Sequence, residues 1–518
     1  MRDFDVLIVG LGPTGATLAG LLGQRGLRVA AFDRLPDLYP LPRALGLDHE
    51  TMRIVQELGI AEQVLPHVAP YKTSLYLGMD GEPIKRLDAM PGPQKLGWFP
   101  NYVFDQPAFE HAIRNRLREL PNVSLNFPVE VVDSGQDAHQ AWVDVRQEGA
   151  TDMTRYQGRY LIACDGGSSA IRKRIGVTLE DLEFDEPWLV VDAIVNDDKL
   201  DALPATNIQY CEAQRPTTFV VGPGKHRRWE IMLKEGDSLS SDFPDEELWP
   251  LLARWIKPGE AKLWRAAAYR FHGLLARSWR DNRILLAGDA AHMTPPFLAQ
   301  GMVSGMRDAH NLAWKLERVI KGVSSDTLLD SYEIERKPHV RETILVSMKL
   351  GRVICEQDET LARQRDQELR ALQNGLVGTE YRQNLIPNLQ AGLIDTGHAG
   401  AGEMLPQPRV RAGGFDGLLD DLTGRGFRLV SKGGLDTLQR EAYLSSLQKL
   451  GGTLVELGQE TAGGESIQMV EKDAILFDWM EKTGAVAVIA RPDHYIYSSA
   501  STHKDAMSQL RHLASALA

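Results

Sequence analysis

The sequence predicts an α/β protein of three domains, and three observations support this fold class. Continuous apolar runs typical of buried parallel strands alternate with helical segments at the amino terminus and return near residue 283. Between them, short alternating segments separated by Pro- and Gly-containing turns predict a mixed sheet. A further pattern of strands and helices follows residue 405, and 518 residues suit about three domains of ordinary size.

The first predicted unit runs from strand to turn to helix. The apolar run Val6–Val9 leads directly into Gly10, Gly12 and Gly15, and an Ala- and Leu-rich helical stretch follows. In this spacing the first glycine permits a tight turn, the second lets backbone amides approach a pyrophosphate, and the third lets helix and strand pack closely. The unit therefore predicts a dinucleotide-binding fold.

A second strand, 28–32, completes the βαβ unit and ends at Asp33. An acid at this position can accept hydrogen bonds from ribose hydroxyls, and the alternative is a carboxylate that only caps the end of the strand. Further along, a helical pattern follows Gln106, and the segments 123–132 and 141–147 alternate like antiparallel strands. The first sheet is therefore expected to be mixed.

Domain boundaries follow from where the patterns change. Predicted strands at 188–194, 207–211, 217–222 and 228–234 define a substrate-binding sheet domain over 181–280. A strand ending at Gly288 and Asp289, followed by an apolar-faced helix over 302–320, returns the chain to the first domain, so we assign 1–180 and 281–395 to it. The third domain is expected at 405–518, with strands at 427–430, 452–456 and 485–489 and helices near 435–449, 475–482 and 501–517.

Composition narrows the range of partners. The net charge of −12 disfavours general binding to nucleic acid or to anionic membranes. Three scattered cysteines suit neither a disulfide framework nor a Cys-rich zinc site, and no paired-ligand spacing predicts a metal. The amino terminus lacks a basic region before its short apolar run, and no apolar stretch reaches about 18 residues. We expect a cytoplasmic protein with a small-molecule substrate.

Two remote motifs extend the glycine turn. Cys164-Asp165-Gly166-Gly167-Ser168-Ser169-Ala170-Ile171-Arg172 follows one strand, and Ala287-Gly288-Asp289-Ala290-Ala291-His292 follows another, with Pro295-Pro296 and Gly301 beyond. In this order the three motifs resemble the group A flavoprotein aromatic hydroxylases, which share the para-hydroxybenzoate hydroxylase fold. The segments 215–218, 226–230, 279–280 and 286–316 look most like the 3-(3-hydroxyphenyl)propionate hydroxylase branch.

The resemblance implies a Rossmann-like FAD-binding domain, a mixed-sheet substrate domain and a carboxy-terminal thioredoxin-like domain. It implies a monooxygenase that holds FAD non-covalently, takes NADH or NADPH and O2 as co-substrates, and hydroxylates a phenol ortho or para to its hydroxyl through a flavin C4a-hydroperoxide. A 3-(3-hydroxyphenyl)propionate-like acid or a small phenol of aromatic catabolism is the leading substrate. The alternatives are a tailoring hydroxylase or epoxidase of a polyketide or quinolone, and a non-catalytic FAD-binding redox sensor.

The resemblance also assigns the cofactor residues. The glycine turn would bind the ADP half of FAD, Asp289 would bind the ribityl chain, and Asp165 with Gly166 would support FAD and the nicotinamide. The helix from Gly301 would direct backbone amides at the flavin, where negative charge accumulates on reduction. The full predicted set is Gly10, Gly12, Gly15, Asp33, Arg34, Arg43, Gln106, Asp165, Gly166, Gly288, Asp289, Gly301 and Met302.

Other predictions rest on fewer observations. The flavin loop reads Ala299-Gln300-Gly301-Met302-Val303, where the family has Gly at the first position and often Asn at the last. No catalytic residue is assigned; His272 and Pro295 are candidates. His292 is expected to be structural. The candidates for substrate contact are Gln209, Thr218, Trp229 and Ile231.

The third domain is expected to contribute no chemistry of its own. Thioredoxin chemistry requires a thiolate and a resolving partner, and residues 400–518 contain no cysteine. The apolar faces of its helices must nevertheless be buried. We therefore expect it to support folding or assembly, and a homodimer is one arrangement that would use it.

Overall fold

The computed structural model describes residues 2–71, 73–238, 243–373, 377–458 and 465–518. Its first sheet has the strand order β17-β18-β11-β1-β2-β8. The central strands are β1 (Arg2–Val9), β2 (Val29–Phe32), β8 (Val123–Asn126), β11 (Met153–Ala163) and β18 (Ile284–Leu286), and these pairs are parallel. Antiparallel pairing enters through β17 (Arg280–Asp281), β9 (Val129–Gln136) and β10 (Ala141–Gln147), so the predicted mixed sheet is confirmed.

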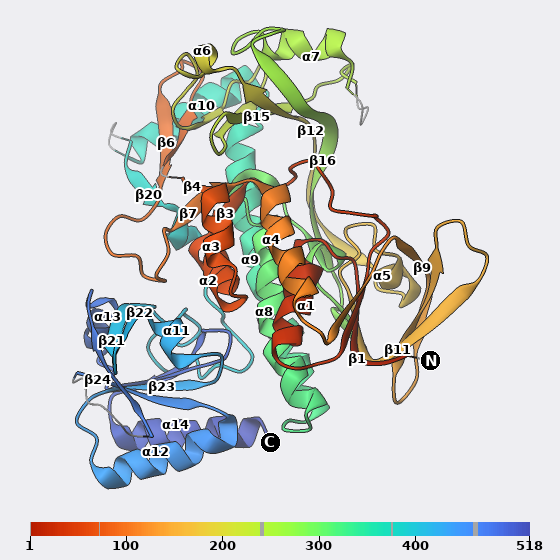
Figure 1. The fold of residues 1–518 in the computed structure, drawn as a ribbon. Coiled ribbons are helices and arrows are strands. Elements are labelled where there is room, and N and C mark those ends of the chain that lie inside the picture. Colours follow the sequence, from red (N-terminus) through yellow and green to blue (C-terminus); the bar gives the residue numbers. More distant parts are fainter. Residues whose placement is uncertain (1, 72, 239–242, 374–376, 459–464) are drawn as a thin grey trace.

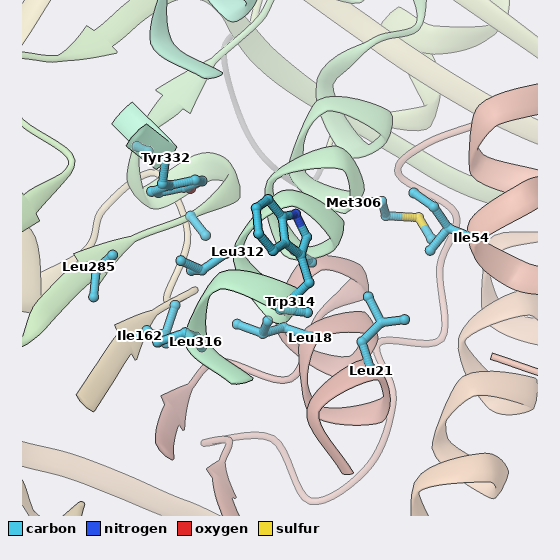
Figure 2. Packing of buried hydrophobic residues seen from close by; sticks show 14 of the residues in the cluster. Leu18, Leu21, Ile54, Ile162, Leu285, Met306, Leu312, Trp314, Leu316 and Tyr332 are labelled. Carbon is cyan, nitrogen blue, oxygen red and sulfur yellow. The ribbon is translucent and has the colours of Figure 1, made fainter. Parts of the chain in front are cut away.

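Helices α1 (Pro13–Gln24), α4 (Gln106–Arg118) and α8 (Gly301–Ile320) form the layer beside this sheet (Figure 1). Figure 2 shows Leu18 and Leu21 of α1 around one part of α8, Ile162 and Leu285 around another, and Met306 directed at Ile54 of α2 (His49–Glu57). Most residues of α8 are buried, and these include the charged side chains of Arg307, Asp308 and Lys315 as well as the apolar face that the sequence predicts. Helices α1, α2 and α9 all pack against α8.

The second sheet has nine strands in the order β19-β16-β12-β15-β14-β13-β5-β6-β20. Its long members are β12 (Leu179–Val195) and β16 (Ala261–Ala276); the shorter ones are β13 (Asn207–Tyr210), β14 (Thr217–Val221) and β15 (His226–Met232). Helix α7 (Asp245–Leu252) covers its outer face (Figure 1).

Four strands of this sheet come from outside the predicted range 181–280. These are β5 (Thr73–Leu77), β6 (Pro83–Asp88), β19 (His292–Met293) and β20 (Thr379–Tyr381). The pairing of β13 with β5 joins residues more than 100 positions apart, and such pairing leaves no local signal in a sequence. A separate small sheet consists of β3 (Gly46–Asp48), β7 (Asn101–Phe104) and β4 (Val68–Pro70), with β7 in the middle.

The carboxy-terminal domain contains a seven-stranded sheet in the order β22-β21-β25-β24-β23-β26-β27. The strands are β21 (Arg409–Ala412), β22 (Phe415–Leu418), β23 (Arg428–Lys432), β24 (Thr453–Leu457), β25 (Ile467–Glu471), β26 (Ala487–Ala490) and β27 (Ile496–Ala500). Helices α12 (Thr437–Leu450) and α14 (His503–Ala516) lie side by side on one face, and α11 (Leu419–Thr423) and α13 (Ile475–Thr483) complete the domain (Figure 1). The predicted strands and helices of this region are confirmed.

Helix α9 (Asp330–Ile354) packs beside α8 and is followed by α10 (Glu359–Ala371). The carboxy-terminal domain lies against α2 and α8 (Figure 1), and Trp314 of α8 meets Phe427 edge-on with ring centroids 5.6 Å apart. Their shared burial makes this part of the domain continuous with the main core. None of the helices in the described part of the chain combines the length and hydropathy needed to cross a lipid bilayer.

Candidate active site

The glycine turn lies where β1 gives way to α1. Gly10 has φ +97°, and a Cβ there would lie 2.2 Å from the Cys164 carbonyl oxygen; a Cβ on Gly15 would lie 2.0 Å from the Gly10 carbonyl oxygen. A Cβ on Gly12 would meet no atom within 4 Å, so its surroundings are open. Gly12 caps α1 without a side-chain hydrogen bond. The turn therefore combines close packing behind it with a helix amino terminus that can receive an anion.

Two charged residues lie beside this turn. Asp33 Oδ2 accepts from the Leu11 amide at 2.7 Å and Oδ1 from the Leu35 amide at 2.9 Å, so Asp33 does cap the strand end. Each oxygen retains a second lone pair, and ribose binding stays a prediction. Arg34 is exposed to solvent.

Arg114, which the sequence analysis missed, also reaches the turn. Its Nη2 donates to the Leu11 carbonyl at 3.2 Å, whereas Nε and Nη1 are buried and find no hydrogen-bond partner among the described residues. Unsatisfied guanidinium donors at a helix amino terminus suit a phosphate. A helical signal could have revealed it, because Gln106, Glu110 and Arg114 recur every four residues on α4.

Gln106 fixes the loop that carries Arg43. Its Oε1 accepts from the Arg43 and Ala44 amides at 2.7 and 2.6 Å, and its Nε2 donates to Glu110 Oε1 at 2.7 Å. Burial raises the pKa of Glu110, although the bond from Gln106 and the charges of Arg43 and Arg114 act in the opposite direction. The Arg43 side chain is exposed and lies close enough to Asp289 to stabilise the ionised form of that acid.

The turn from Asp165 to Arg172 lies beside the glycine turn, at the end of β11. Asp165 Oδ2 accepts from the Ile171 amide at 3.3 Å, whereas Oδ1 is buried without a partner in the described structure. Gly166 follows with φ +83°. Arg172 donates to the carbonyls of Gly167 and Ala290 at 2.7 and 2.8 Å, which ties this turn to the one that carries Asp289.

The turn from Gly288 to Ala290 is held by Asp308 of α8. Asp308 Oδ2 accepts from the Gly288 amide at 3.0 Å and lies 2.7 Å from His292 Nε2, and Oδ1 accepts from Arg336 Nε at 3.0 Å. His292 and Asp308 are fully buried, which supports the expected structural role of His292. Asp289 is surrounded by protein yet accessible to solvent, and burial raises its pKa.

Helix α8 begins at Gly301, close to the predicted start. Gln300 caps it without a side-chain hydrogen bond to the first turn; its Oε1 instead accepts from Arg307 Nη1 at 2.6 Å. Gly301 and Met302 are half-buried. Ala299 has φ +53°, a left-handed conformation that favours glycine, and this explains the family's Gly at that position. The first amides of α8 are thus open to an acceptor.

One face of the nine-stranded sheet is directed at the cofactor turns. Arg228 donates to the carbonyls of Arg43 and Pro42 at 2.9 and 3.2 Å, and its Nε donates to Asp192 Oδ1 at 2.7 Å. Thr218 lies opposite Glu230, and Gln209 opposite Thr218. Since residues alternate between the faces of a strand, Arg228 and Glu230 share this inner face. Thr218 Oγ1 donates to Gln209 Oε1.

The other two substrate candidates lie on the opposite face. Trp229 and Ile231 are fully buried in a cluster with Leu248 and Leu252 of α7. Their alternation with Arg228 and Glu230 directs them away from the cofactor turns. This placement removes Trp229 and Ile231 from the set of substrate contacts. Glu230, which the sequence analysis did not select, takes their place: it is 8% exposed, and burial raises its pKa.

The two catalytic candidates, Pro295 and His272, do not lie at the same site. Pro295 accepts from Ser347 Oγ at 2.6 Å and precedes Phe297, whose ring lies 5.6 Å from Trp188 and 6.0 Å from Phe271. His272 follows Phe271 on β16 and pairs instead with Asp185, at 3.4 Å. Because successive residues of a strand face opposite sides, His272 points away from this aromatic cluster. His272 is therefore not a catalytic candidate in this structure.

The described residues contain one group whose side chains could together ligate a metal ion: Glu57, His310 and His494. Arg25 forms a 2.8 Å ion pair with Glu57, and Arg428 hydrogen-bonds His494 Nδ1. The Arg25 guanidinium already neutralises the Glu57 carboxylate. The group is better described as part of an ion-pair network between the first domain and the carboxy-terminal domain.

The fold and the turns at the strand ends define a dinucleotide-binding protein. The FAD binding domain family model matches residues 3–347, and the HcaD C-terminal domain model matches residues 402–516. The chain is 37% identical over 527 residues to the probable NADH-specific resorcinol 4-hydroxylase of Rhodococcus jostii (strain RHA1), covering 100% of this chain and 96% of that relative. It is 30% identical over 568 residues to the 3-(3-hydroxy-phenyl)propionate/3-hydroxycinnamic acid hydroxylase of Comamonas testosteroni, covering 96% and 94%.

Solved structures give the same fold. The flavin-dependent monooxygenase PieE, in complex with FAD and substrate, has a TM-score of 0.82 at 19% identity, with 99% of each chain covered. A ternary complex of aklavinone-11 hydroxylase with FAD and aklavinone has a TM-score of 0.77 at 19% identity, also with 99% of each covered. The chain belongs to the FAD binding domain family and is a FAD-dependent aromatic hydroxylase that uses NAD(P)H and O2.

Proposed function

We propose that this chain hydroxylates a small phenol that carries no carboxylate, at the inner face of the nine-stranded sheet, with NADH as reductant. The observation that carries this proposal is the row of Gln209, Thr218 and Glu230. On one side of the row, Arg228 contacts the loop of Pro42 and Arg43. On the other side, Trp188 contacts Phe297, just after Pro295. The row thus lies between the predicted cofactor loop and the aromatic cluster.

The residues of the cofactor turns fit FAD. Arg114 offers two unsatisfied buried donors beside an open helix amino terminus, and these would hold the pyrophosphate. Asp33 would accept from the adenosine ribose, and Asp289 from the ribityl hydroxyls. The first amides of α8 would face the flavin ring. Asp165, whose Oδ1 lacks a partner among the described groups, would bind beside them.

FAD, when bound, supplies hydride acceptance from the nicotinamide and activation of O2. The tasks left to the chain are to orient the phenol, to exclude water and to handle its hydroxyl proton. Gln209 and Thr218 are already hydrogen-bonded to each other, which fixes their orientation. Glu230 would hydrogen-bond the phenol hydroxyl, and Trp188, Phe271 and Phe297 would shield the ring from solvent.

Charge favours a neutral phenol over a phenolic acid. Glu230 is buried in this row, and in its ionised form it would repel a substrate carboxylate placed beside it. The neighbouring cations are engaged: Arg228 pairs with Asp192 and, at 3.7 Å, with Glu230, and Arg265 donates to the Pro42 carbonyl. The relative named as a resorcinol hydroxylase supports a dihydroxybenzene. The relative named for 3-(3-hydroxyphenyl)propionate makes the phenolic acid the second candidate.

The test compares resorcinol with 3-(3-hydroxyphenyl)propionate on the FAD-loaded enzyme. We expect resorcinol to stimulate NADH consumption with matching formation of a trihydroxybenzene, and the acid to give little of either. Stimulation by the acid alone would overturn the substrate assignment. Tight FAD binding without product from either compound, or from a panel of other phenols, would favour the redox-sensor alternative.

For the carboxy-terminal domain we infer a thioredoxin-like form. The support is the strand order β24-β23-β26-β27, with a parallel pair followed by two antiparallel pairs and with α12 and α14 packed together. Without a cysteine it has no dithiol chemistry. A superposition on thioredoxin in which these four strands failed to align would remove this inference.

A further inference from the structure

A tyrosine of the carboxy-terminal domain lies at one end of a hydrogen-bond chain that reaches the start of α8. Tyr495 donates from its hydroxyl to Glu50 Oε1 at 2.8 Å. Glu50 Oε2 accepts from Arg307 Nε at 2.5 Å, and Arg307 Nη1 donates to Gln300 Oε1 at 2.6 Å. Gln300 directly precedes Gly301, where the helix begins. We call these four residues the Tyr495 chain.

Every member of the Tyr495 chain is removed from solvent. Arg307 is 3% exposed, Gln300 4%, and Glu50 and Tyr495 5% each. Arg307 also pairs with Asp48, which caps α2 by accepting from the Thr51 amide at 2.9 Å. One guanidinium therefore satisfies two carboxylates and one amide oxygen. In such a buried network, removal of one partner changes the position and energy of the others.

The far end of the chain is itself anchored. Arg491 pairs with Asp493 and, at 2.8 Å, with Glu335 Oε2 of α9, and Asn311 Nδ2 of α8 donates to Asp493 Oδ2 at 3.0 Å. These bonds hold the loop that carries Tyr495 against the first domain. Burial and the Glu50 carboxylate raise the pKa of Tyr495, so its hydroxyl keeps its proton and remains a donor.

The near end adjoins the predicted flavin contact. Gln300 leaves the first turn of α8 without a side-chain cap, because its oxygen is committed to Arg307. The preceding residue, Ala299, is held in a left-handed conformation and packs against β3, where a Cβ on Gly46 would lie 2.8 Å from the Ala299 Cβ. The direction of the first α8 amides thus depends on the side chain of Gln300 and what it binds.

We propose that Tyr495 is a positioning residue for the flavin: through Glu50 and Arg307 it fixes Gln300 and hence the α8 amides that face the isoalloxazine. The carboxy-terminal domain then influences flavin binding and redox potential without touching the cofactor. This inference rests on the proposed placement of the flavin at the α8 amino terminus. It also gives the domain a role beyond packing and assembly.

The test is Tyr495→Phe in the full-length holoenzyme, with Tyr443→Phe as matched control. Tyr443 is also a buried tyrosine of this domain, but its hydroxyl donates within the domain, to the His503 carbonyl at 3.1 Å. FAD dissociation constant, flavin midpoint potential and flavin circular dichroism are measured. We expect Tyr495→Phe to weaken FAD binding roughly 3- to 10-fold, as for loss of one hydrogen bond acting indirectly, and to shift the potential; Tyr443→Phe should change neither.

A second variant keeps the result decisive if Tyr495→Phe folds poorly. Glu50→Gln alters the same chain from the first domain, and the two changes combined should give less than the sum of their single effects. Wild-type FAD affinity, potential and flavin dichroism in Tyr495→Phe would overturn the inference, as would strict additivity. These readouts do not need a substrate, so failure to hydroxylate any phenol would count against the proposed function and leave this inference standing.

Discussion

Asp33 and Asp289 are both acids at the ends of strands in the first sheet, yet their surroundings differ. Both Asp33 oxygens accept backbone amides, so part of its capacity is used within the protein. Asp289 is accessible to solvent and has a raised pKa, because its charge is poorly solvated by the surrounding protein. Hydrogen bonds from the hydroxyls of a bound polyol should therefore stabilise the carboxylate of Asp289 more than that of Asp33.

Asp289→Ala should weaken FAD binding by roughly 10- to 100-fold, the range for loss of a hydrogen bond to a charged group. The measurement is the FAD dissociation constant of the apoprotein by fluorescence titration. Asp152→Ala, at an exposed position, is the control and should leave the constant unchanged. Equal affinity in the two variants would exclude Asp289 from the cofactor site.

Glu230→Gln tests the substrate row. The substitution keeps the shape of the side chain but removes its titration, so it should raise KM for the phenol by roughly 2- to 10-fold, with a smaller effect on kcat. Burial raises the pKa of Glu230. A plot of wild-type kcat/KM against pH should therefore show an inflection above the pH at which a glutamate usually titrates. That inflection should disappear in the variant, and an unchanged pH profile would argue against contact between Glu230 and substrate.

At the scale of elements, α8 combines three tasks. Its amino terminus faces the predicted flavin position, Asp308 in its second turn holds the turn with Gly288 and Asp289, and Lys315 and Trp314 contact buried partners further along. The helix start, its apolar face and the adjoining strand were predictable, because each leaves a local pattern. Asp308 was not predictable, since nothing in its local sequence shows that three distant groups converge on it.

Asp308→Asn should destabilise the protein by about 3 to 5 kcal/mol, because it leaves Arg336 buried without its charge partner. Denaturant unfolding monitored by tryptophan fluorescence measures the change. Asp330→Asn is a matched acid-to-amide control, since Asp330 also pairs with an arginine, Arg280, but its side chain is 57% exposed. It should cost less than about 1 kcal/mol, and comparable losses in both variants would refute the assigned role of Asp308.

The nine-stranded sheet shows a second limit of prediction at this scale. Its local strands were found, but β5 and β6 joined it from the first domain, and the face of each strand was not known. Trp229 and Ile231 were candidates for substrate contact, but both lie on the face that packs against α7, whereas Glu230 lies on the inner face. The face on which each side chain lies depends on strand register, because a shift of one residue exchanges the two faces of a strand.

At the scale of the whole molecule, the carboxy-terminal domain is joined to the first by buried charges. Arg53 donates to Asp420, and Glu335 bonds both Lys315 and Arg491. Because charged residues are usually exposed, the sequence alone would place each of these residues on the surface. The sequence therefore predicted a separate domain but not the kind of interface that holds it.

This interface should loosen in acid. Although burial opposes its charge, Arg491 and Lys315 lower the pKa of Glu335 to about 2, from 4.5. A lowered folded-state pKa stabilises the protein above about pH 4.5, and the stabilisation is lost as the pH falls toward 2. Between pH 5 and pH 3, Glu335 should contribute a loss of about 2 kcal/mol in the free energy of unfolding.

Denaturant unfolding at several pH values measures this slope. Glu335→Gln should be less stable at pH 7 but show a shallower decline in acid than the wild type. Glu317→Gln, at a partly exposed ion pair on α8, should keep the wild-type slope. A Glu335→Gln slope equal to the wild type would show that this carboxylate does not govern the acid sensitivity of the interface.

As a FAD-dependent hydroxylase, this chain should transfer one oxygen atom from O2 to a phenol, and we propose NADH as its reductant. The most direct test is mass spectrometry of the resorcinol product formed under oxygen-18 labelled O2, with NADH consumption recorded in parallel. We expect a trihydroxybenzene that carries one labelled oxygen for each NADH consumed. NADH oxidation that yields only hydrogen peroxide with every phenol tested, or a product whose new oxygen comes from water, would contradict it.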